Sequence, residues 1–200
     1  MSDILNLAKV YMESVFDDSD WAPFTFHSIH HTTTVLEKAL EWATACNLRP
    51  EESEAIQLAA MFHDLGYLTR YDNHESEGIW LFSVFAEENG IPADQQKVVK
   101  RLIECTRKTH SDFSIPLYEI MHDIDRVGMG MPDFVDQGLN LRKEWEHFKS
   151  FQTNDVEWFA SQIEYLEKTK FKTDYGRSNY SDQKRKNRES LKRLLQDSSI

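Results

Sequence analysis

The sequence lacks long apolar runs and is poor in cysteine. No apolar run approaches the ~18–20 residues that span a bilayer. The N-terminal segment MSDILNLAKVYMESVFDD carries early acids and has no basic region before an apolar core, so we expect no signal peptide. The two cysteines, Cys46 and Cys105, are too few for a disulfide framework or a Cys-rich zinc site. These absences predict a reducing, cytoplasmic location without membrane association.

Positive charge is also scarce. The chain has 34 acidic and 23 basic residues and a net charge of −11, which argues against a nucleic-acid polymer as partner. Basic residues cluster late, in KRKNRESLKRLL, but acids flank and interrupt that segment. We interpret it as a solvated amphipathic helix. With 40% hydrophobic residues the chain is too apolar to be disordered, and its length suits one sizeable core.

No segment has a convincing strand pattern, and no internal repeat, low-complexity tract or long Ser/Gly linker divides the chain. Apolar residues instead recur at helical spacing. We predict helices at residues 2–16, 28–45, 51–65, 75–89, 93–108, 116–127, 134–149, 154–169 and 181–196. Ser2 and Pro50 mark two of the helix starts. The expected fold is all-α, in a single compact domain of residues 1–200.

Each central helix of the prediction has an apolar face. The residues expected to point inward are Val35, Leu36, Ala39, Leu40 and Ala43; Ala55, Leu58, Ala59 and Phe62; Val98, Val99, Leu102 and Ile103; and Leu117, Ile120, Met121 and Ile124.

Four polar residues extend these apolar faces. His31 lies one helical turn before Val35, the pair His63–Asp64 ends the 51–65 helix, and Asp125 lies one turn after Met121. Such side chains are costly to bury without partners, and a divalent cation between converging helices would satisfy all four. Mixed nitrogen and oxygen ligation suits Mn²⁺, Fe²⁺, Co²⁺, Ni²⁺ or Zn²⁺ better than Ca²⁺. The alternative is a buried polar network, or helix-end caps, without a metal.

The stretch MFHDLGY adds a geometric condition. Adjacent residues of a regular helix diverge by about 100°, so His63 and Asp64 share one metal only where the helix relaxes. Leu65 and Gly66 supply that helix end.

The ordered set of His31, His63–Asp64 and Asp125 resembles the signature of the HD superfamily of metal-dependent phosphohydrolases. The segments FHSIHHTTTV, DNHESEG, DIDRVGMG, LRKEWE and KRKNRESLKRLL are similar to one subgroup of predicted HD phosphohydrolases, and the likeness covers residues 26–195. It selects His31 rather than His27 or His30 as ligand. It implies a helical core of residues 26–130, with C-terminal helices of residues 131–197 packing on it.

Differences from better-characterised relatives in the residues after the HD pair narrow the expected activity and number of metal ions. LGYLTRYD follows the HD pair where alarmone hydrolases have Glu-Asp. Leu68 stands where cyclic-dinucleotide phosphodiesterases have the Pro of a Gly-Tyr-Pro element. It also stands where deoxynucleotide monophosphatases often have Glu. Dinuclear members add two His ligands; His74 fits one, but Cys105 and Thr106 stand near the second position. We therefore expect one divalent ion (Mn, Fe, Mg, Ni, Co or Zn), bound by His31, His63, Asp64 and Asp125.

Several further residues are candidates around this ion. We expect Asp64, His74 and Lys108 to be catalytic, and the substrate-binding residues to be His74, Glu75, Lys108, His110 and Arg142. Helix capping is the alternative role of His74–Glu75, and Lys108 and His110 are expected where a helix ends. Arg142 has an alternative role in an ion pair with Glu144.

Other polar residues receive structural or secondary roles. Asp123 is the alternative to Asp125, but we expect it to face solvent. His27 is expected to pack against its loop, and Lys184 and Asn187 to close the pocket. We assign His30, His122 and His147 to the surface or to packing.

The predicted function is metal-dependent hydrolysis of a phosphate ester in a small, nucleotide-like molecule. One alternative is a metal-stabilised nucleotide sensor without turnover, and another is an HD-type di-iron oxygenase, which requires more His ligands than we can place. A homodimer is a further open alternative.

Overall fold

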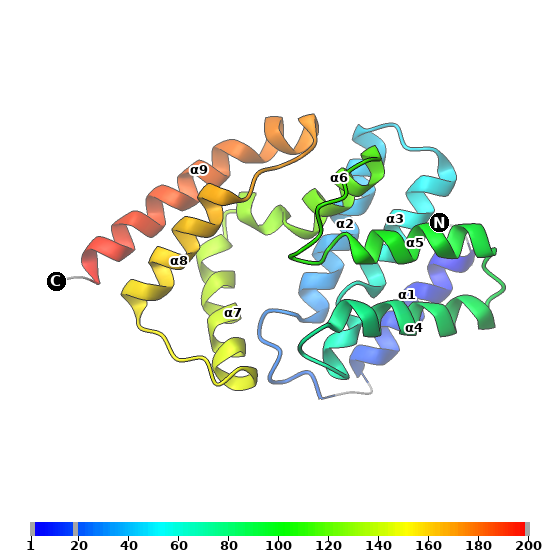
Figure 1. Ribbon diagram of the computed structural model, residues 1–200, viewed down its shortest axis with the longest axis horizontal. Helices are drawn as coiled ribbons and strands as arrows, with labels where there is room; N and C mark the ends of the chain where they lie inside the picture. Colours follow the sequence, from blue (N-terminus) through cyan, green and yellow to red (C-terminus); the bar gives the residue numbers. More distant parts are fainter. Residues whose placement is uncertain (1–2, 18–19, 199–200) are drawn as a thin grey trace. The chain divides into compact units, whose positions relative to one another are not determined.

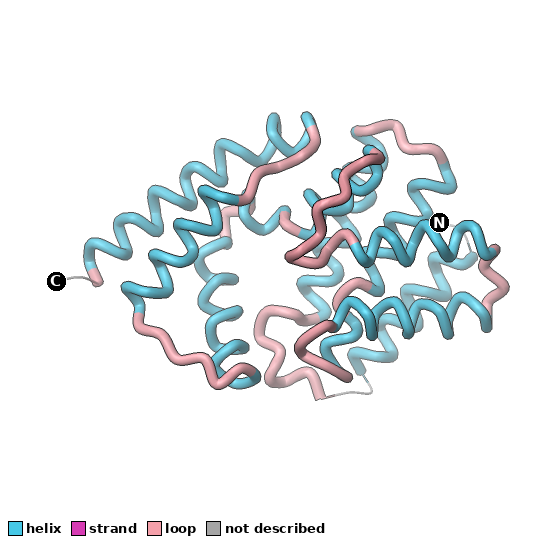
Figure 2. The backbone as a smooth tube through the Cα atoms, viewed as in Figure 1, coloured by secondary structure: helices cyan, strands magenta, loops and turns pink. Residues whose placement is uncertain are grey.

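The computed structural model describes residues 3–17 and 20–198 (Figure 1), so the expected N-cap Ser2 lies outside the described residues. Every regular element in these ranges is helical (Figure 2), which confirms the all-α prediction. No helix within these ranges is long and apolar enough to cross a membrane.

Contacts along the chain define two compact units. Unit 1 comprises Met1–Ala22 and His27–Asp125, and unit 2 comprises Pro23–Phe26 and Arg126–Ile200. Unit 1 contains α1 (Asp3–Asp17), α2 (Ile29–Ala45), α3 (Pro50–Phe62), the 3-10 helix η1 (Leu65–Leu68), α4 (His74–Glu88), α5 (Ala93–Glu104) and α6 (Pro116–Asp125). Unit 2 contains the 3-10 helix η2 (Val127–Gly130), α7 (Phe134–Phe148), α8 (Asp155–Lys168) and α9 (Asp174–Asp197). That the C-terminal helices pack on the core in a single domain stays a prediction.

Helix α3 is the centre of unit 1. It packs against α1, α2, α4, α5 and α6, and its side chains from Ala55 to Phe62 are all buried. Three alanines on α3 let neighbouring helices approach closely, while Leu58 and Phe62 fill the remaining space. The Phe62 ring stacks on Tyr11 with centroids 5.6 Å apart. Because α3 is surrounded by helices, groups at its C-terminal end are carried into the interior.

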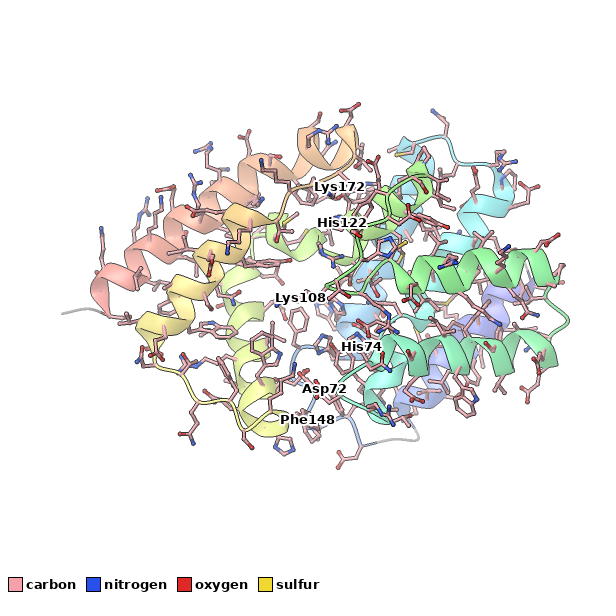
Figure 3. The ribbon with its side chains drawn as sticks, viewed as in Figure 1. Asp72, His74, Lys108, His122, Phe148 and Lys172 are labelled. Carbon is pink, nitrogen blue, oxygen red and sulfur yellow. The ribbon has the colours of Figure 1, made fainter. Side chains whose placement is uncertain are left out.

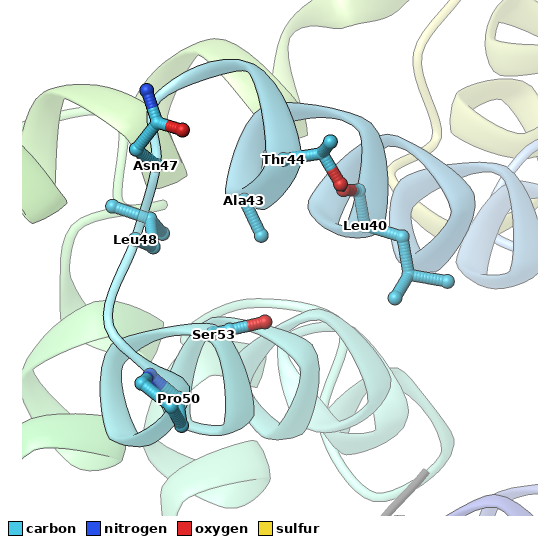
Figure 4. Close-up of a pocket in the computed structure, with 7 residues that line it drawn as sticks. All are labelled: Leu40, Ala43, Thr44, Asn47, Leu48, Pro50 and Ser53. Carbon is cyan, nitrogen blue, oxygen red and sulfur yellow. The ribbon is translucent and has the colours of Figure 1, made fainter.

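The predicted inward faces are largely correct, with two exceptions. Leu40 is 41% exposed and Val98 is 37% exposed, so both predictions are wrong. On α2 the buried face turns toward Thr32 and Trp42 instead. Leu40 lines a shallow pocket of about 380 Å³ between the end of α2 and the start of α3 (Figure 4).

Two helix boundaries differ from the prediction by four residues or more. α5 ends at Glu104 instead of residue 108, because the Cys105 N–H bonds to the carbonyls of Arg101 and Leu102 and the Thr106 hydroxyl donates to Ile103 O at 2.8 Å. These bonds close the last turn early.

The start of α9 is the second difference, since it begins at Asp174 and not at 181. The Thr173 hydroxyl accepts a hydrogen bond from the Gly176 N–H at 2.9 Å, and Tyr180 is buried against Phe171. A side-chain cap and one buried aromatic therefore order a polar stretch that has little apolar periodicity.

Two glycines bring α4 unusually close to the end of α3. A Cβ at Gly66 would lie 2.0 Å from His74 O and 2.6 Å from Gly78 N. A Cβ at Gly78 would lie 2.6 Å from Phe62 O. Both clashes are with backbone atoms, which cannot rotate away. The approach of α4 to η1 therefore depends on the absence of a side chain at both positions.

We predict that Gly66→Ala lowers the free energy of unfolding by about 1–3 kcal/mol or more, because α4 must move to admit the methyl group. Gly128→Ala is the matched control, since a Cβ there meets nothing within 4 Å. Denaturant unfolding of both variants checks this. Equal stability of the two would show that α4 does not need this close approach.

Candidate metal centre

The His63–Asp64 pair lies where α3 gives way to η1. Phe62 is the last residue of α3, and His63 is its C-cap, with its N–H bonded to Ala59 O at 3.0 Å. The helix therefore ends three residues before the predicted end at residue 65. The predicted departure from regular helix geometry does occur, at the His63–Asp64 pair itself. Asp64 adopts φ −107° and ψ −4°, outside regular α geometry. Consequently its Oδ2 lies 3.1 Å from His63 Nε2, although the residues are adjacent in sequence.

The imidazole of His63 is oriented as a metal-ligating imidazole would be. Its Nδ1 lies 2.8 Å from Ala60 O, and because a carbonyl only accepts, Nδ1 carries the proton and donates it. When an ion displaces the second proton, the neutral ring would present the lone pair of Nε2 to it. This Nε2 is fully buried and has no hydrogen-bond partner among the described residues. A buried ring nitrogen whose opposite nitrogen is fixed by a backbone carbonyl is typical of a metal ligand.

The other predicted ligands converge on this nitrogen. Ligand atoms of His31, His63 and Asp125 all lie within 4.8 Å of one another. Asp64 Oδ2 is 3.2 Å from His31 Nε2, and Asp125 Oδ1 is 3.5 Å from His63 Nε2. Atoms that share an ion at about 2.1 Å stand roughly 3–4 Å apart, so the donor set fits a divalent transition metal. The residues of this donor set come from α2, the end of α3 and α6.

Without an ion, a proton balances the charges of this centre. Burial opposes protonation of His63, but the negative charges of Asp64 and Asp125 outweigh burial and raise its pKa to about 9. Burial would raise the pKa of Asp64, yet the charge of His63 and the hydrogen bond from His31 hold it well below its usual range. The ion-free centre thus contains an imidazolium facing carboxylates, and an ion must displace that proton.

His74 lies beside the centre at the start of α4. Its Nε2 is 3.6 Å from Asp64 Oδ1 and 3.6 Å from Glu75 Oε1. Tyr67 stacks on the His74 ring at 3.7 Å between centroids and on the His27 ring at 3.9 Å. Burial is the largest influence on the His74 ring and lowers its pKa. The structure therefore places a neutral, stacked imidazole next to Asp64. His27 stacks on Tyr67 of η1, and its expected packing against its own loop stays a prediction.

Lys108 and His110 follow α5 and do not end it, so that prediction is wrong. Lys108 is exposed, and Figure 3 labels it together with His74. It has no ion pair or hydrogen bond to any residue in the described part of the chain. His110 Nε2 contacts the carbonyl oxygen of Asp112, and its ring meets Phe113 edge-on.

Asp123 does not face solvent as predicted. It is fully buried, and its Oδ1 lies 3.1 Å from His122 Nδ1. Two positions along a helix turn by about 200°, so Asp123 and Asp125 point to opposite sides of α6. The carboxylate that faces the end of α3 is Asp125, because its Oδ1 lies 3.5 Å from His63 Nε2.

The remaining candidates belong to unit 2. Arg142 Nε lies 3.1 Å from Glu146 and its Nη1 lies 2.6 Å from Asp155, so the predicted pairing with Glu144 is wrong. Glu144 accepts a hydrogen bond from the Phe26 N–H at 2.9 Å.

Lys184 and Asn187 bond to backbone carbonyls of unit 2. Lys184 donates to Thr169 O, and Asn187 donates to Met129 O and Met131 O at 3.0 and 2.7 Å. The Asn187 amide thereby ties α9 to η2.

Arg107 was missed by the sequence reasoning. It donates hydrogen bonds to Asn73 and Ser76 at the start of α4, and its Nη1 lies 3.4 Å from Glu75 Oε2. No local pattern links residues that are more than 30 positions apart, so no sequence signal was available.

The comparison with protein-family models supports the geometry. Residues 28–130 match the model of the HD domain. This match covers more than half of the chain, which therefore belongs to the HD domain family. Comparisons with curated proteins and with solved structures found no match.

The raised pKa of His63 predicts a pH dependence of the metal-free fold. The folded-state pKa of about 9 exceeds the ordinary value of 6.5. The contribution of protonated His63 to the free energy of unfolding is therefore fully present below pH 6.5. It is lost as pH rises through 9, which lowers the free energy of unfolding by ~3 kcal/mol at most. Denaturant unfolding in chelator between pH 6 and 9.5, with an NMR titration of the ring, measures it. A ring that titrates near 6.5 would contradict the assignment.

Proposed function

We propose that unit 1 is a metal-dependent phosphohydrolase that cleaves a phosphate ester in a small, nucleotide-like molecule. The observation that carries the proposal is His63 Nε2, a buried nitrogen without a hydrogen bond that faces His31, Asp64 and Asp125. Membership of the HD domain family supports the same chemistry. His31, His63, Asp64 and Asp125 would hold a divalent ion, which would supply Lewis acidity toward a phosphoryl oxygen and toward water.

Asp64 and His74 are suited to handle the proton released when water attacks phosphorus. Asp64 stays a carboxylate because its pKa is held well below the usual range. Its Oδ1, on the side away from His63, lies 3.6 Å from His74 Nε2. A neutral His74 can accept a proton there, and its stacking on Tyr67 fixes the ring in that orientation.

The substrate's charge requires a cation at the edge of this centre. Lys108 is the candidate, because its ammonium group is exposed and unpaired within the described residues. His110 and Glu75 are secondary candidates for substrate contact. Arg142 is less suited, since Glu146, Asp155 and Thr153 already accept its hydrogen bonds. The net charge of −11 favours a small phosphorylated molecule over a nucleic-acid polymer.

We predict that Asp64→Asn abolishes metal-dependent phosphate release, with a loss of at least ~100-fold. The variant should also lose the thermal stabilisation by metal, worth ~2.7 kcal/mol when free metal is 100 times its dissociation constant. Phosphate release from nucleotides and generic esters with Mn²⁺, Mg²⁺, Co²⁺ or Ni²⁺, and melting with and without metal, measure both effects. Asp94→Asn, on the exposed start of α5, is the isosteric control and should behave as wild type.

Two outcomes would argue against the proposal. Full metal-dependent turnover by Asp64→Asn would remove Asp64 from the chemistry. Tight nucleotide binding by the metal-loaded wild type without product after hours would instead favour a sensor.

A further inference from the structure

We infer that Arg107 is a positioning residue that holds the start of α4, and with it His74, against the metal centre. This inference rests on the proposed function for its kinetic consequence, but its structural consequence is testable without turnover. Arg107 lies in the loop between α5 and α6, and its side chain is 22% exposed.

Every nitrogen of the Arg107 guanidinium group is engaged. Nη1 donates to Asn73 Oδ1 at 2.6 Å, Nη2 donates to Ser76 Oγ at 2.6 Å, and Nε donates to Glu104 Oε1 at 2.8 Å. Nη1 also lies 3.4 Å from Glu75 Oε2. A guanidinium group whose planar donors are fixed in this way is preorganised to join two segments. It has little capacity left to bind a phosphate.

Asn73 explains why the start of α4 needs such support. It adopts φ +67° and ψ 31°, a left-handed conformation that is uncommon for residues other than glycine. It precedes α4 as the N-cap residue, yet its side chain does not cap the helix. Instead, Asn73 Oδ1 accepts from both Arg107 and Ser76, whose hydroxyl lies 3.0 Å away. Arg107, Asn73 and Ser76 thus form a closed ring of hydrogen bonds that replaces the usual cap.

The ring of hydrogen bonds around Arg107 holds the residues on either side of His74, which lies beside the candidate centre. His74 lies between Asn73 and Glu75, and both neighbours contact Arg107. Glu75 Oε2 faces Arg107, while Glu75 Oε1 lies 3.6 Å from His74 Nε2. His74 Nε2 in turn lies 3.6 Å from Asp64 Oδ1. A continuous series of polar contacts therefore runs from Arg107 through Glu75 and His74 to the metal centre.

Arg107 and Lys108 are adjacent cations with different expected roles. Arg107 acts through α4, so its loss should lower kcat and leave KM nearly unchanged. Lys108 is unpaired in the described structure, so its loss should raise KM. Opposite kinetic signatures from neighbouring positive residues separate positioning from substrate binding.

The test compares Arg107→Ala, Arg107→Lys and Lys108→Ala with Arg101→Ala, which removes the same charge from an exposed position on α5. Amide hydrogen exchange of residues 76–80 in the metal-free proteins should be roughly tenfold faster in both Arg107 variants only. With the same esters as above, both Arg107 variants should lose roughly 10- to 100-fold in kcat, with KM within about twofold of wild type. Lys108→Ala should raise KM at least about tenfold.

Chemical rescue provides the sharpest control. Methylguanidinium added to Arg107→Ala should restore part of kcat and of the amide protection. The Arg107→Lys substitution should not restore either, because the lysine ammonium group lacks the planar donors of a guanidinium group. If Arg107→Ala does not fold, Arg107→Lys carries the same comparison.

Unchanged exchange at residues 76–80, or kcat within about twofold of wild type, would overturn the inference. A rise in KM with constant kcat would do so as well, since it would place Arg107 on the substrate. Absence of turnover by the wild type would instead count against the proposed function, and the exchange experiment would still decide the role of Arg107.

Discussion

The centre depends on the burial of one carboxylate and one imidazole, those of Asp64 and His63, at the end of a helix that other helices surround. Asp64 is buried too deeply to stay charged at low cost without a positive partner. His63 supplies one as an imidazolium, and a divalent ion would supply a stronger one. Nδ1 of His63 donates its hydrogen bond to Ala60 O, so either the second proton or a metal ion would bind at Nε2. A proton and a metal ion would therefore compete for this nitrogen, and pH and metal concentration would act on the same buried charge balance.

The position of α4 follows from a different constraint, the lack of a side chain at Gly66 and Gly78. Close backbone contact brings the first turn of α4 against the His63–Asp64 junction, and the stacking of Tyr67 on His74 then orients the imidazole. The ring of hydrogen bonds around Arg107 secures the same turn from its other end. The close backbone approach, the stacking of Tyr67 and the hydrogen bonds of Arg107 all act on the first turn of α4. Residues of this turn therefore have little freedom to move independently of one another.

The sequence predicted those features that depend on local periodicity. Helices, most of their buried faces and the polar residues that extend those faces follow from the spacing of apolar residues, since a buried helix must repeat near 3.6 residues. That reasoning placed His31, His63, Asp64 and Asp125 on faces that the structure brings together. It failed where the deciding contact is distant or polar. The start of α9 depends on the Thr173 cap. The burial of Asp123 depends on the packing of α6 against α2, α3 and α5, and the hydrogen bonds from Arg107 to α4 join residues more than 30 positions apart.

The central placement of α3 connects stability with chemistry. Its all-round burial makes its C-terminal end a rigid attachment point, so His63 and Asp64 have little freedom even without an ion. The other ligands come from α2 and α6, both of which pack directly on α3. A metal ion would therefore join helices that already share one apolar core, and the core would hold the ligands near their bound positions before the ion arrives. Such preorganisation lowers the ordering cost of metal binding.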